Sequence, residues 1–218
     1  AGTVGNLVTD GYSGYNDVVG EGKRSRVGCW AHARRKFYEA LSTAPEAWEL
    51  LDKIVALYRV EHDAAEAGVL TTEAHGILRE ERSRGIVSEI EAWVDARKDA
   101  TPPKSPLGVA LTYAKNQRQA LRKFLSDPKL PLDNNASERA LRIIAVGRKN
   151  FLFVGHQEGG QNLAILQTVC STCQLHGINP YEYVRDIAVR VGSHPASRLD
   201  ELLPMNWVPP PGTEVGSG

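Results

Sequence analysis

Apolar residues recur every three or four positions through most of this chain of 218 residues, a spacing that predicts amphipathic helices. Helices are expected at 32–41, 45–68, 71–100, 107–125, 134–147, 160–176 and 179–191. Short apolar segments at 6–9, 27–29 and 151–154 predict strands. The large aromatic residues Trp30, Phe37, Tyr38, Trp48, Tyr58 and Trp93 are interpreted as core residues. The pattern therefore predicts a helix-rich α/β protein.

The formal net charge is zero, but the charges are segregated along the chain. Residues 45–99 hold 13 acidic and 7 basic residues, so the remaining residues hold 13 acidic and 19 basic ones. Residues 22–36 contain six Lys and Arg and no acid. A basic frame of this kind favours a phosphate backbone as partner. Solvated charged faces that merely happen to segregate are the alternative.

The cysteines and the apolar runs bear on the compartment. Three cysteines, an odd number, fit a reducing compartment better than a disulfide framework, and we expect a cytoplasmic protein. No run of 18 apolar residues predicts a membrane span, and residues 1–5 do not resemble a signal peptide.

Two segments carry candidate chemistry. Asp133, Asn134 and Asn135 supply N-cap chemistry for a helix whose first turns hold Glu138. Far upstream, Asp10 stands at the end of the strand at 6–9, before a glycine-containing loop. Each segment alone is explained by a helix start or an Asp-Gly turn. Together they suggest two carboxylates aimed at a metal that acts on phosphodiesters.

Four ordered motifs resemble the catalytic region of the insertion sequence 66 family of bacterial transposases. They are Thr9-Asp-Gly-Tyr12 with Gly14-Tyr15, Gly28-Cys-Trp-Ala-His-Ala-Arg-Arg-Lys-Phe37, Asp133-Asn-Asn-Ala-Ser-Glu-Arg-Ala-Leu-Arg142, and Gly147-Arg-Lys-Asn150. The resemblance continues through Asn179-Pro-Tyr181 and the segment from His194 to Trp207. It thus covers nearly the whole chain.

The resemblance implies a DDE transposase with an RNase H-like core, interrupted by a large helical insertion. Residues 1–44 would belong to the core, 45–125 would be the insertion, 126–192 would complete the core, and 193–218 would form a C-terminal tail. Asp10 and Glu138 would be the second and third acidic residues, and would hold two Mg²⁺ or Mn²⁺ ions for phosphodiester hydrolysis and strand transfer. The expected partners are DNA, as transposon ends and target, and further copies of the protein in the active complex.

The basic residues have expected roles in this picture. Arg139, Arg142, Arg148 and Lys149 would lie along phosphates, and Lys23, Arg24, Arg34 and Arg35 belong to the same basic frame. Contacts of this kind fix position without reading bases.

The chain departs from the family pattern at its start. The first acidic residue of such a triad lies on an upstream strand, and only nine residues precede Asp10. We therefore expect a truncated catalytic region with two of three metal ligands, and little or no cleavage by this chain alone. A catalytically inactive remnant that binds DNA and a helical protein-interaction module are the alternatives.

Cys29 and His32 resemble a Cys-x-x-His motif that follows the second acidic residue in several DDE groups. Cys170 and Cys173 add two more potential zinc ligands. The latter pair continues an apolar helical face, where cysteine behaves as a small hydrophobe. We expect no zinc, a buried Cys29, and a His32 held by hydrogen bonds near the active site.

Overall fold

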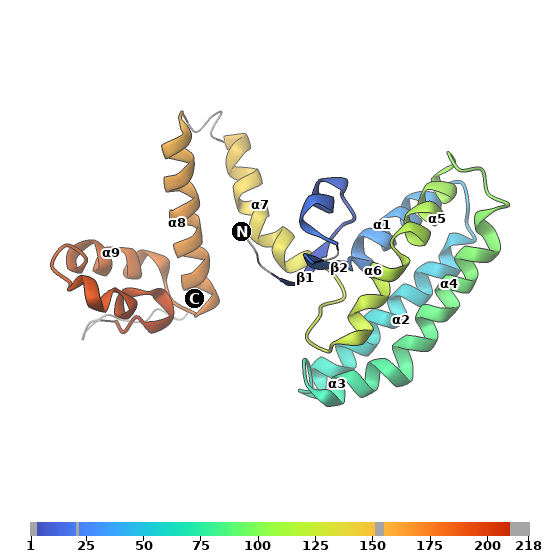
Figure 1. Cartoon of the computed structure of the whole chain (residues 1–218), viewed down its shortest axis with the longest axis horizontal. Coiled ribbons are helices and arrows are strands. Elements are labelled where there is room, and N and C mark those ends of the chain that lie inside the picture. Colours follow the sequence, from blue (N-terminus) through green and yellow to red (C-terminus); the bar gives the residue numbers. More distant parts are fainter. Residues whose placement is uncertain (1–3, 21, 151–154, 210–218) are drawn as a thin grey trace. The chain divides into compact units, whose positions relative to one another are not determined.

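The computed structural model describes residues 4–20, 22–150 and 155–209 (Figure 1). These residues form two compact units that divide between Arg139 and Ala140, and each unit is described by itself. The described residues are mostly helical and contain one sheet of two parallel strands. None of the described helices is long and apolar enough to cross a lipid bilayer. The helix-rich α/β class is confirmed, while the RNase H-like core stays a prediction.

The sheet pairs β1 (Gly5–Thr9) with β2 (Arg24–Gly28) in a register that runs from Gly5 opposite Arg24 to Thr9 opposite Gly28. The crossover between them contains the 3-10 helix η1 (Ser13–Val18), in keeping with the long connection that parallel strands need. β2 begins three residues earlier than the strand predicted at 27–29, because pairing with β1 brings polar residues into the ladder. The strand predicted at 151–154 lies outside the described residues.

Eight helical segments complete the first unit up to residue 126. They are α1 (Trp30–Ala40), α2 (Ala47–Glu66), α3 (Glu73–Leu78), the π-helical turn η2 (Arg79–Ser83), α4 (Arg84–Lys98), α5 (Pro106–Asn116), α6 (Arg118–Arg122) and the 3-10 turn η3 (Lys123–Ser126). The helices predicted at 45–68 and 71–100 are confirmed. The helix predicted at 107–125 breaks at Gln117, whose ψ of 6° leaves the helical region.

One hydrophobic core joins these helices. Buried residues recur at helical spacing on one face of each of the four long helices: Trp30, Ala33 and Phe37 on α1, Leu50, Ile54 and Leu57 on α2, Val87, Ile90 and Val94 on α4, and Leu107, Ala110 and Leu111 on α5. Helix α1 packs against both α2 and α5. Within the described residues, the predicted boundary at residue 45 therefore does not separate two cores, and the four-part division of the chain stays a prediction.

Two of the aromatic residues assigned to the core are exposed. Tyr38 keeps 58% of its surface exposed and Trp48 keeps 56%. Each follows a buried residue of the same helix by one position, at Phe37 and Ala47. A step of one residue turns a side chain by about 100° around the helix axis, so the neighbour of a core residue faces away from the core. The core prediction is wrong for these two positions.

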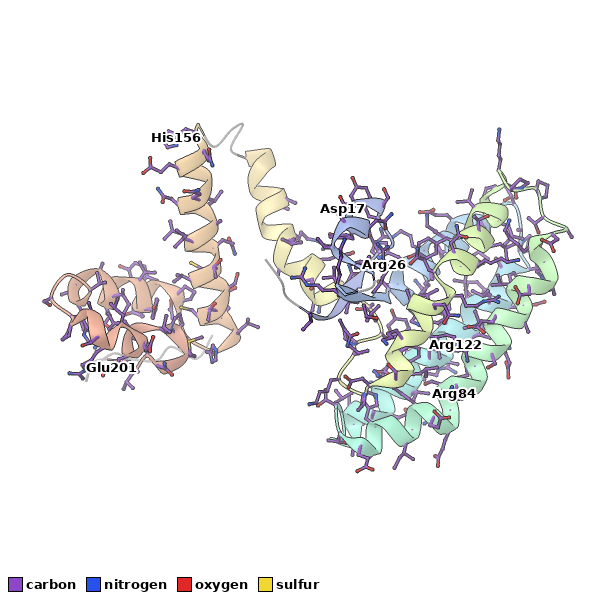
Figure 2. The ribbon with its side chains drawn as sticks, viewed as in Figure 1. Asp17, Arg26, Arg84, Arg122, His156 and Glu201 are labelled. Atoms are coloured by element: carbon purple, nitrogen blue, oxygen red, sulfur yellow. The ribbon has the colours of Figure 1, made fainter. Side chains whose placement is uncertain are left out.

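Helix α7 (Asn135–Asn150) spans the division between the units, and the second unit contains α8 (Gln157–Leu175), α9 (Pro180–Arg190) and the 3-10 turns η4 (Ala196–Leu202) and η5 (Pro204–Asn206). Both α8 and α9 begin with a side-chain cap. His156, labelled in Figure 2, accepts the amide of Gly159 through Nδ1 at 2.8 Å. Asn179 Oδ1 accepts the amide of Tyr181 at 2.9 Å. Such caps satisfy amides that the first turn leaves unpaired.

Candidate active site

Two motif residues lie at the same edge of the sheet, each directly after one of its parallel strands. Because Thr9 is opposite Gly28, the next residues, Asp10 and Cys29, both follow the carboxyl ends of adjacent strands. The Asp10 carboxylate accepts the amide of Tyr12 through Oδ1 at 3.0 Å. Among the described residues, Oδ2 of Asp10 has no protein hydrogen-bond partner. The predicted acidic residue thus holds the start of the loop after β1 through one carboxylate oxygen.

Helix α5 holds the backbone of Asp10. The Tyr113 hydroxyl donates to the Asp10 carbonyl at 2.8 Å. Burial raises the pKa of Tyr113, so its hydroxyl remains a donor. Gly11, with φ of 85°, lets the loop approach so closely that a Cβ there would lie 3.0 Å from the Gln117 side chain. A residue of the predicted insertion thus fixes the segment that carries the first candidate ligand.

The second acidic residue, Glu138, contacts His32 of α1. Glu138 lies in the first turn of α7, and its Oε1 is 3.4 Å from His32 Nε2. The other ring nitrogen, Nδ1, is 3.2 Å from the Cys29 sulfur. Burial raises the pKa of the Cys29 thiol, so the thiol stays protonated. A thiol that donates to Nδ1 leaves the ring proton on Nε2, where it can donate to Glu138.

The start of α7 is tied to the same region by Asp133. Its Oδ1 accepts the Asn135 amide at 3.0 Å, and its Oδ2 accepts the Tyr58 hydroxyl at 2.8 Å. The preceding Leu132 carbonyl accepts the Trp30 amide, where α1 follows β2, at 3.1 Å. Burial and the bond to Asp133 raise the pKa of Tyr58. The predicted N-cap chemistry is present in part: Asp133 accepts the amide of the first residue of α7, and Tyr58 of α2 donates to the same carboxylate.

Two orphaned oxygens flank the candidate ligands. Thr9 Oγ1 precedes Asp10, and Asn134 Oδ1 lies four positions before Glu138; both atoms are buried, and neither has a hydrogen-bond partner among the described residues. Leaving such a buried oxygen without a hydrogen bond costs about 1–3 kcal/mol of stability. Oxygen donors of this kind, like carboxylates, are the ligands that Mg²⁺ and Mn²⁺ prefer. Within residues 4–20, 22–150 and 155–209, no three His, Cys, Asp or Glu side chains converge as a metal cluster, so we assign no third protein ligand.

The residues predicted to bind DNA lie on several elements of the structure. Arg34 and Arg35 are exposed on α1, and Arg139 and Arg142 are exposed on α7. Among the described residues, none of these four makes an ion pair. Lys23 donates to the Asp17 carbonyl at 2.9 Å, and Arg24 lies in β2 (Figure 2). The side chains of Arg148 and Lys149 lie outside the described part of the chain.

Several basic residues of the helical block (residues 45–125) form ion pairs with acidic residues of the same block. Arg84 pairs with Glu80, Arg122 with Glu91 at 2.9 Å, and Arg118 with Asp95 at 2.6 Å (Figure 2). The Arg118 guanidinium lowers the pKa of Asp95. These pairs neutralise charges within the block. The exposed arginines of α1 and α7 have no such partner among the described residues and can meet an external anion.

Sequence reasoning missed Tyr58, Tyr113 and the two orphaned oxygens. Its helical spacing assigns Tyr58 to the core, and no local pattern distinguishes a core tyrosine from one whose hydroxyl reaches a distant segment. The bonds join positions separated by 75 and 103 residues. Such partners can be found only once the fold is known.

Comparisons with known proteins agree with these motifs. The family model "Transposase IS66 family" matches residues 1–162, and the model "IS66 C-terminal element" matches residues 168–205. The chain belongs to the IS66 transposase family. The first model includes the strands, the helical block and the Glu138 helix, so every candidate residue of the site lies inside it.

The curated relatives of this family member come from Sinorhizobium fredii. "Uncharacterized protein y4qI" is 33% identical over 96% of this chain and 40% of its own length. "Uncharacterized protein y4hP" is 30% identical over 95% of this chain and 40% of its own length. The chain therefore spans about 40% of the length of the curated relatives it matches. No solved structure matches it significantly.

Proposed function

We propose that this chain supplies part of a DDE-type catalytic site for DNA transposition, built on part of an RNase H-like fold. Asp10 and Glu138 would bind Mg²⁺ or Mn²⁺, which when bound would activate the attacking hydroxyl and stabilise the leaving oxygen. The substrates are DNA transposon ends and target DNA, and the active complex contains several copies of the protein. Zinc has no role in this proposal.

One observation carries the proposal. His32 Nε2 lies 3.4 Å from Glu138 Oε1, and His32 belongs to the helix that directly follows β2. The strand β2 is paired with β1, which ends beside Asp10. Two acidic residues that are 128 positions apart are thus linked to one edge of one sheet. This supports our prediction that their carboxylates lie about 4–8 Å apart, within reach of ions spaced about 3.5–4 Å.

The chain's own residues have defined roles in this proposal. Tyr113 and Tyr58 hold the two ligand-bearing segments through the Asp10 carbonyl and the Asp133 carboxylate. His32 orients the Glu138 carboxylate, as outer partners of metal ligands do. Arg139 and Arg142 neutralise phosphates and position the DNA without reading its sequence.

Iron-directed backbone cleavage tests the metal site without requiring DNA cleavage. Fe²⁺ replaces Mg²⁺ at oxygen ligands and, with ascorbate and peroxide, generates radicals that cut the nearby backbone. We expect cuts next to residue 10 and at 134–138, competed by Mg²⁺ and lost in Asp10→Asn and Glu138→Gln. Glu158 also lies in the first turn of a helix, so Glu158→Gln is the matched control and should keep the pattern. If the same cuts persist in both Asp10→Asn and Glu138→Gln, the proposal is contradicted.

Tyr113→Phe should weaken Mn²⁺ binding by about tenfold, the lower end of the effect of losing an outer partner of a metal ligand. The variant removes only the hydroxyl that holds the Asp10 carbonyl. Isothermal titration with Mn²⁺ measures the change, and urea unfolding should show a loss of only about 1 kcal/mol.

Tyr183→Phe is the matched control, because the Tyr183 hydroxyl also donates to a carbonyl, that of Leu202 at 2.5 Å. It should cost similar stability and leave Mn²⁺ affinity unchanged. Equal Mn²⁺ affinity in wild type and Tyr113→Phe would rule out the positioning role.

Arg142→Ala should weaken binding to duplex DNA of any sequence. Each phosphate contact releases condensed counterions, so the slope of log affinity against log salt should become shallower by about one unit. Fluorescence anisotropy over a series of salt concentrations measures this slope. Arg198→Ala is the control, because Arg198 already pairs with Glu201 at 2.6 Å. Binding that does not depend on salt would favour the protein-interaction module instead.

A further inference from the structure

A groove on the first unit is lined mainly by residues that the proposed metal site does not use; the exception is Tyr58, whose hydroxyl holds Asp133. It is lined by Arg34, Arg35 and Tyr38 of α1, by Val55 and Tyr58 of α2, and by Asn135 of α7. The groove has a volume of about 440 Å³, which falls within the range of about 300–1,000 Å³ for small-molecule sites. None of the residues that line it is acidic. Its shape and charge therefore suit an anionic ligand the size of a nucleotide.

The side chains on α1 combine two chemistries on one face. Tyr38 follows Arg34 by four positions and Arg35 by three, a spacing that places all three on neighbouring turns. Both arginines are exposed, and Tyr38 keeps 58% of its surface exposed. A guanidinium fits a phosphate, and an exposed aromatic ring fits the flat face of a base. The pair of groups matches a nucleic-acid strand better than a simple carboxylate ligand.

Helix α2 contributes Val55 and Tyr58 to the groove. Tyr58 donates its hydroxyl to Asp133 at 2.8 Å, so its ring, rather than its hydroxyl, is available to a ligand. Val55 lies three positions earlier on the same helix and also lines the groove. A base stacked on Tyr38 would thus share the groove with the Tyr58 ring and Val55.

The groove adjoins the candidate active site. Asn135, which lines it, is the first residue of α7, and Glu138 lies one turn further along that helix. His32, which contacts Glu138, precedes Arg34 by two positions on α1. A strand held in the groove would therefore continue toward the residues proposed to bind metal.

We propose that this groove binds an unpaired nucleotide of the DNA strand, with its phosphates on Arg34 and Arg35 and its base stacked on Tyr38. The inference rests on the proposed transposase function and adds the kind of DNA that the site accepts. In a duplex, both faces of a base are covered by neighbouring bases, so Tyr38 can stack only on a base that has left the helix. The groove therefore favours single-stranded DNA near the cleavage point.

The test compares three fluorescein-labelled ligands of equal length: single-stranded DNA, the same strand with abasic positions, and a duplex. Fluorescence anisotropy with the whole 218-residue chain measures each affinity. Tyr38→Ala should weaken binding to the single strand by about 5- to 150-fold, the range for losing one stacked base. It should change binding to the abasic strand and to the duplex by less than about twofold. Tyr38→Phe, which keeps the ring, should restore single-strand affinity.

Tyr181 provides the matched control. It is also an exposed tyrosine at a four-residue spacing from an arginine, with 69% of its surface exposed and its ring 5.9 Å from Arg185. Tyr181→Ala should leave all three affinities unchanged. Equal losses for single strand and abasic strand in Tyr38→Ala would overturn the proposal, as would an unchanged single-strand affinity.

The test separates this inference from the proposed function. If Tyr38→Ala has no effect while iron-directed cuts still depend on Asp10 and Glu138, the groove proposal fails and the metal site stands. If the iron-directed cuts persist in Asp10→Asn and Glu138→Gln while Tyr38→Ala weakens single-strand binding as expected, the catalytic assignment fails. The groove then remains a binding site for single-stranded DNA.

Discussion

Replacing Glu138 by Gln should lower metal-dependent strand cleavage by roughly 10³-fold in a transposase that contains this chain. A catalytic metal contributes several kcal/mol of charge stabilisation, and each 1.36 kcal/mol corresponds to tenfold in rate. Gln is nearly the same size as Glu and still offers an oxygen to His32 Nε2, which lies 3.4 Å from Glu138. The substitution therefore removes the negative charge and leaves the local hydrogen bond in place.

The measurement uses a longer transposase in which this chain replaces the corresponding region of a relative, with supercoiled DNA and Mg²⁺ or Mn²⁺. Duplex DNA affinity at fixed salt should change little in Glu138→Gln, because a metal ligand and no phosphate contact has been lost. Glu158→Gln, at the equivalent place on α8, should cut normally. Full cleavage by Glu138→Gln would show that the carboxylate is not a metal ligand.

Helical spacing predicted most of the first unit because its core is built from single faces of long helices. In α2, the buried residues Leu50, Ile54 and Leu57 recur at steps of three and four, which is the signal that periodicity detects. The strand β2 was harder to find. Its first half, Arg24-Ser25-Arg26, has no apolar alternation, and only the backbone ladder with β1 makes it a strand.

The sequence was sufficient to predict the candidate metal ligands, but not the residues that hold them in place. Asp10 and Glu138 follow local signals, a strand end and a helix start, and the resemblance to a family connects them. The hydroxyls of Tyr58 and Tyr113 act across helix–loop contacts, with partners 75 and 103 positions away. Nothing in the neighbourhood of either tyrosine indicates such a partner. Tyr38 was missed for the opposite reason, since its aromatic ring suggested the core.

Arg79 shows the same limit for a charged residue. Its charge predicts a solvent-exposed position, yet only 1% of its surface is exposed. The partners that make this burial possible lie on α2 and after α6: Glu61, and the carbonyls of Phe124 and Asp127. A buried charge persists only where such partners converge. The π-helical turn at 79–83 contains this residue, and π-turns interrupt the regular spacing on which sequence prediction relies.

Arg79→Ala should lower the unfolding free energy of the first unit by about 3–5 kcal/mol, the cost of breaking a buried ion pair from one side. Arg79 donates to Glu61 through Nε at 2.8 Å and through Nη2 at 2.6 Å. Its Nη1 donates to the Phe124 and Asp127 carbonyls at 2.8 and 3.2 Å. The substitution leaves a carboxylate that is only 19% exposed and two carbonyls without this donor. Urea unfolding followed by circular dichroism measures the loss.

Arg82→Ala is the matched control, because Arg82 is three positions further along and pairs with Asp63 while both side chains remain 45% exposed. An exposed pair contributes about 0–1 kcal/mol, so the control should unfold close to wild type. The double variant Arg79→Met/Glu61→Leu removes both charges and fills the space with apolar atoms. It should recover much of the stability, since apolar replacements of buried ion pairs are often neutral or stabilising. A loss in Arg79→Ala as small as that in Arg82→Ala would mean that the buried pair does not stabilise the contact between α2 and the segment after α6.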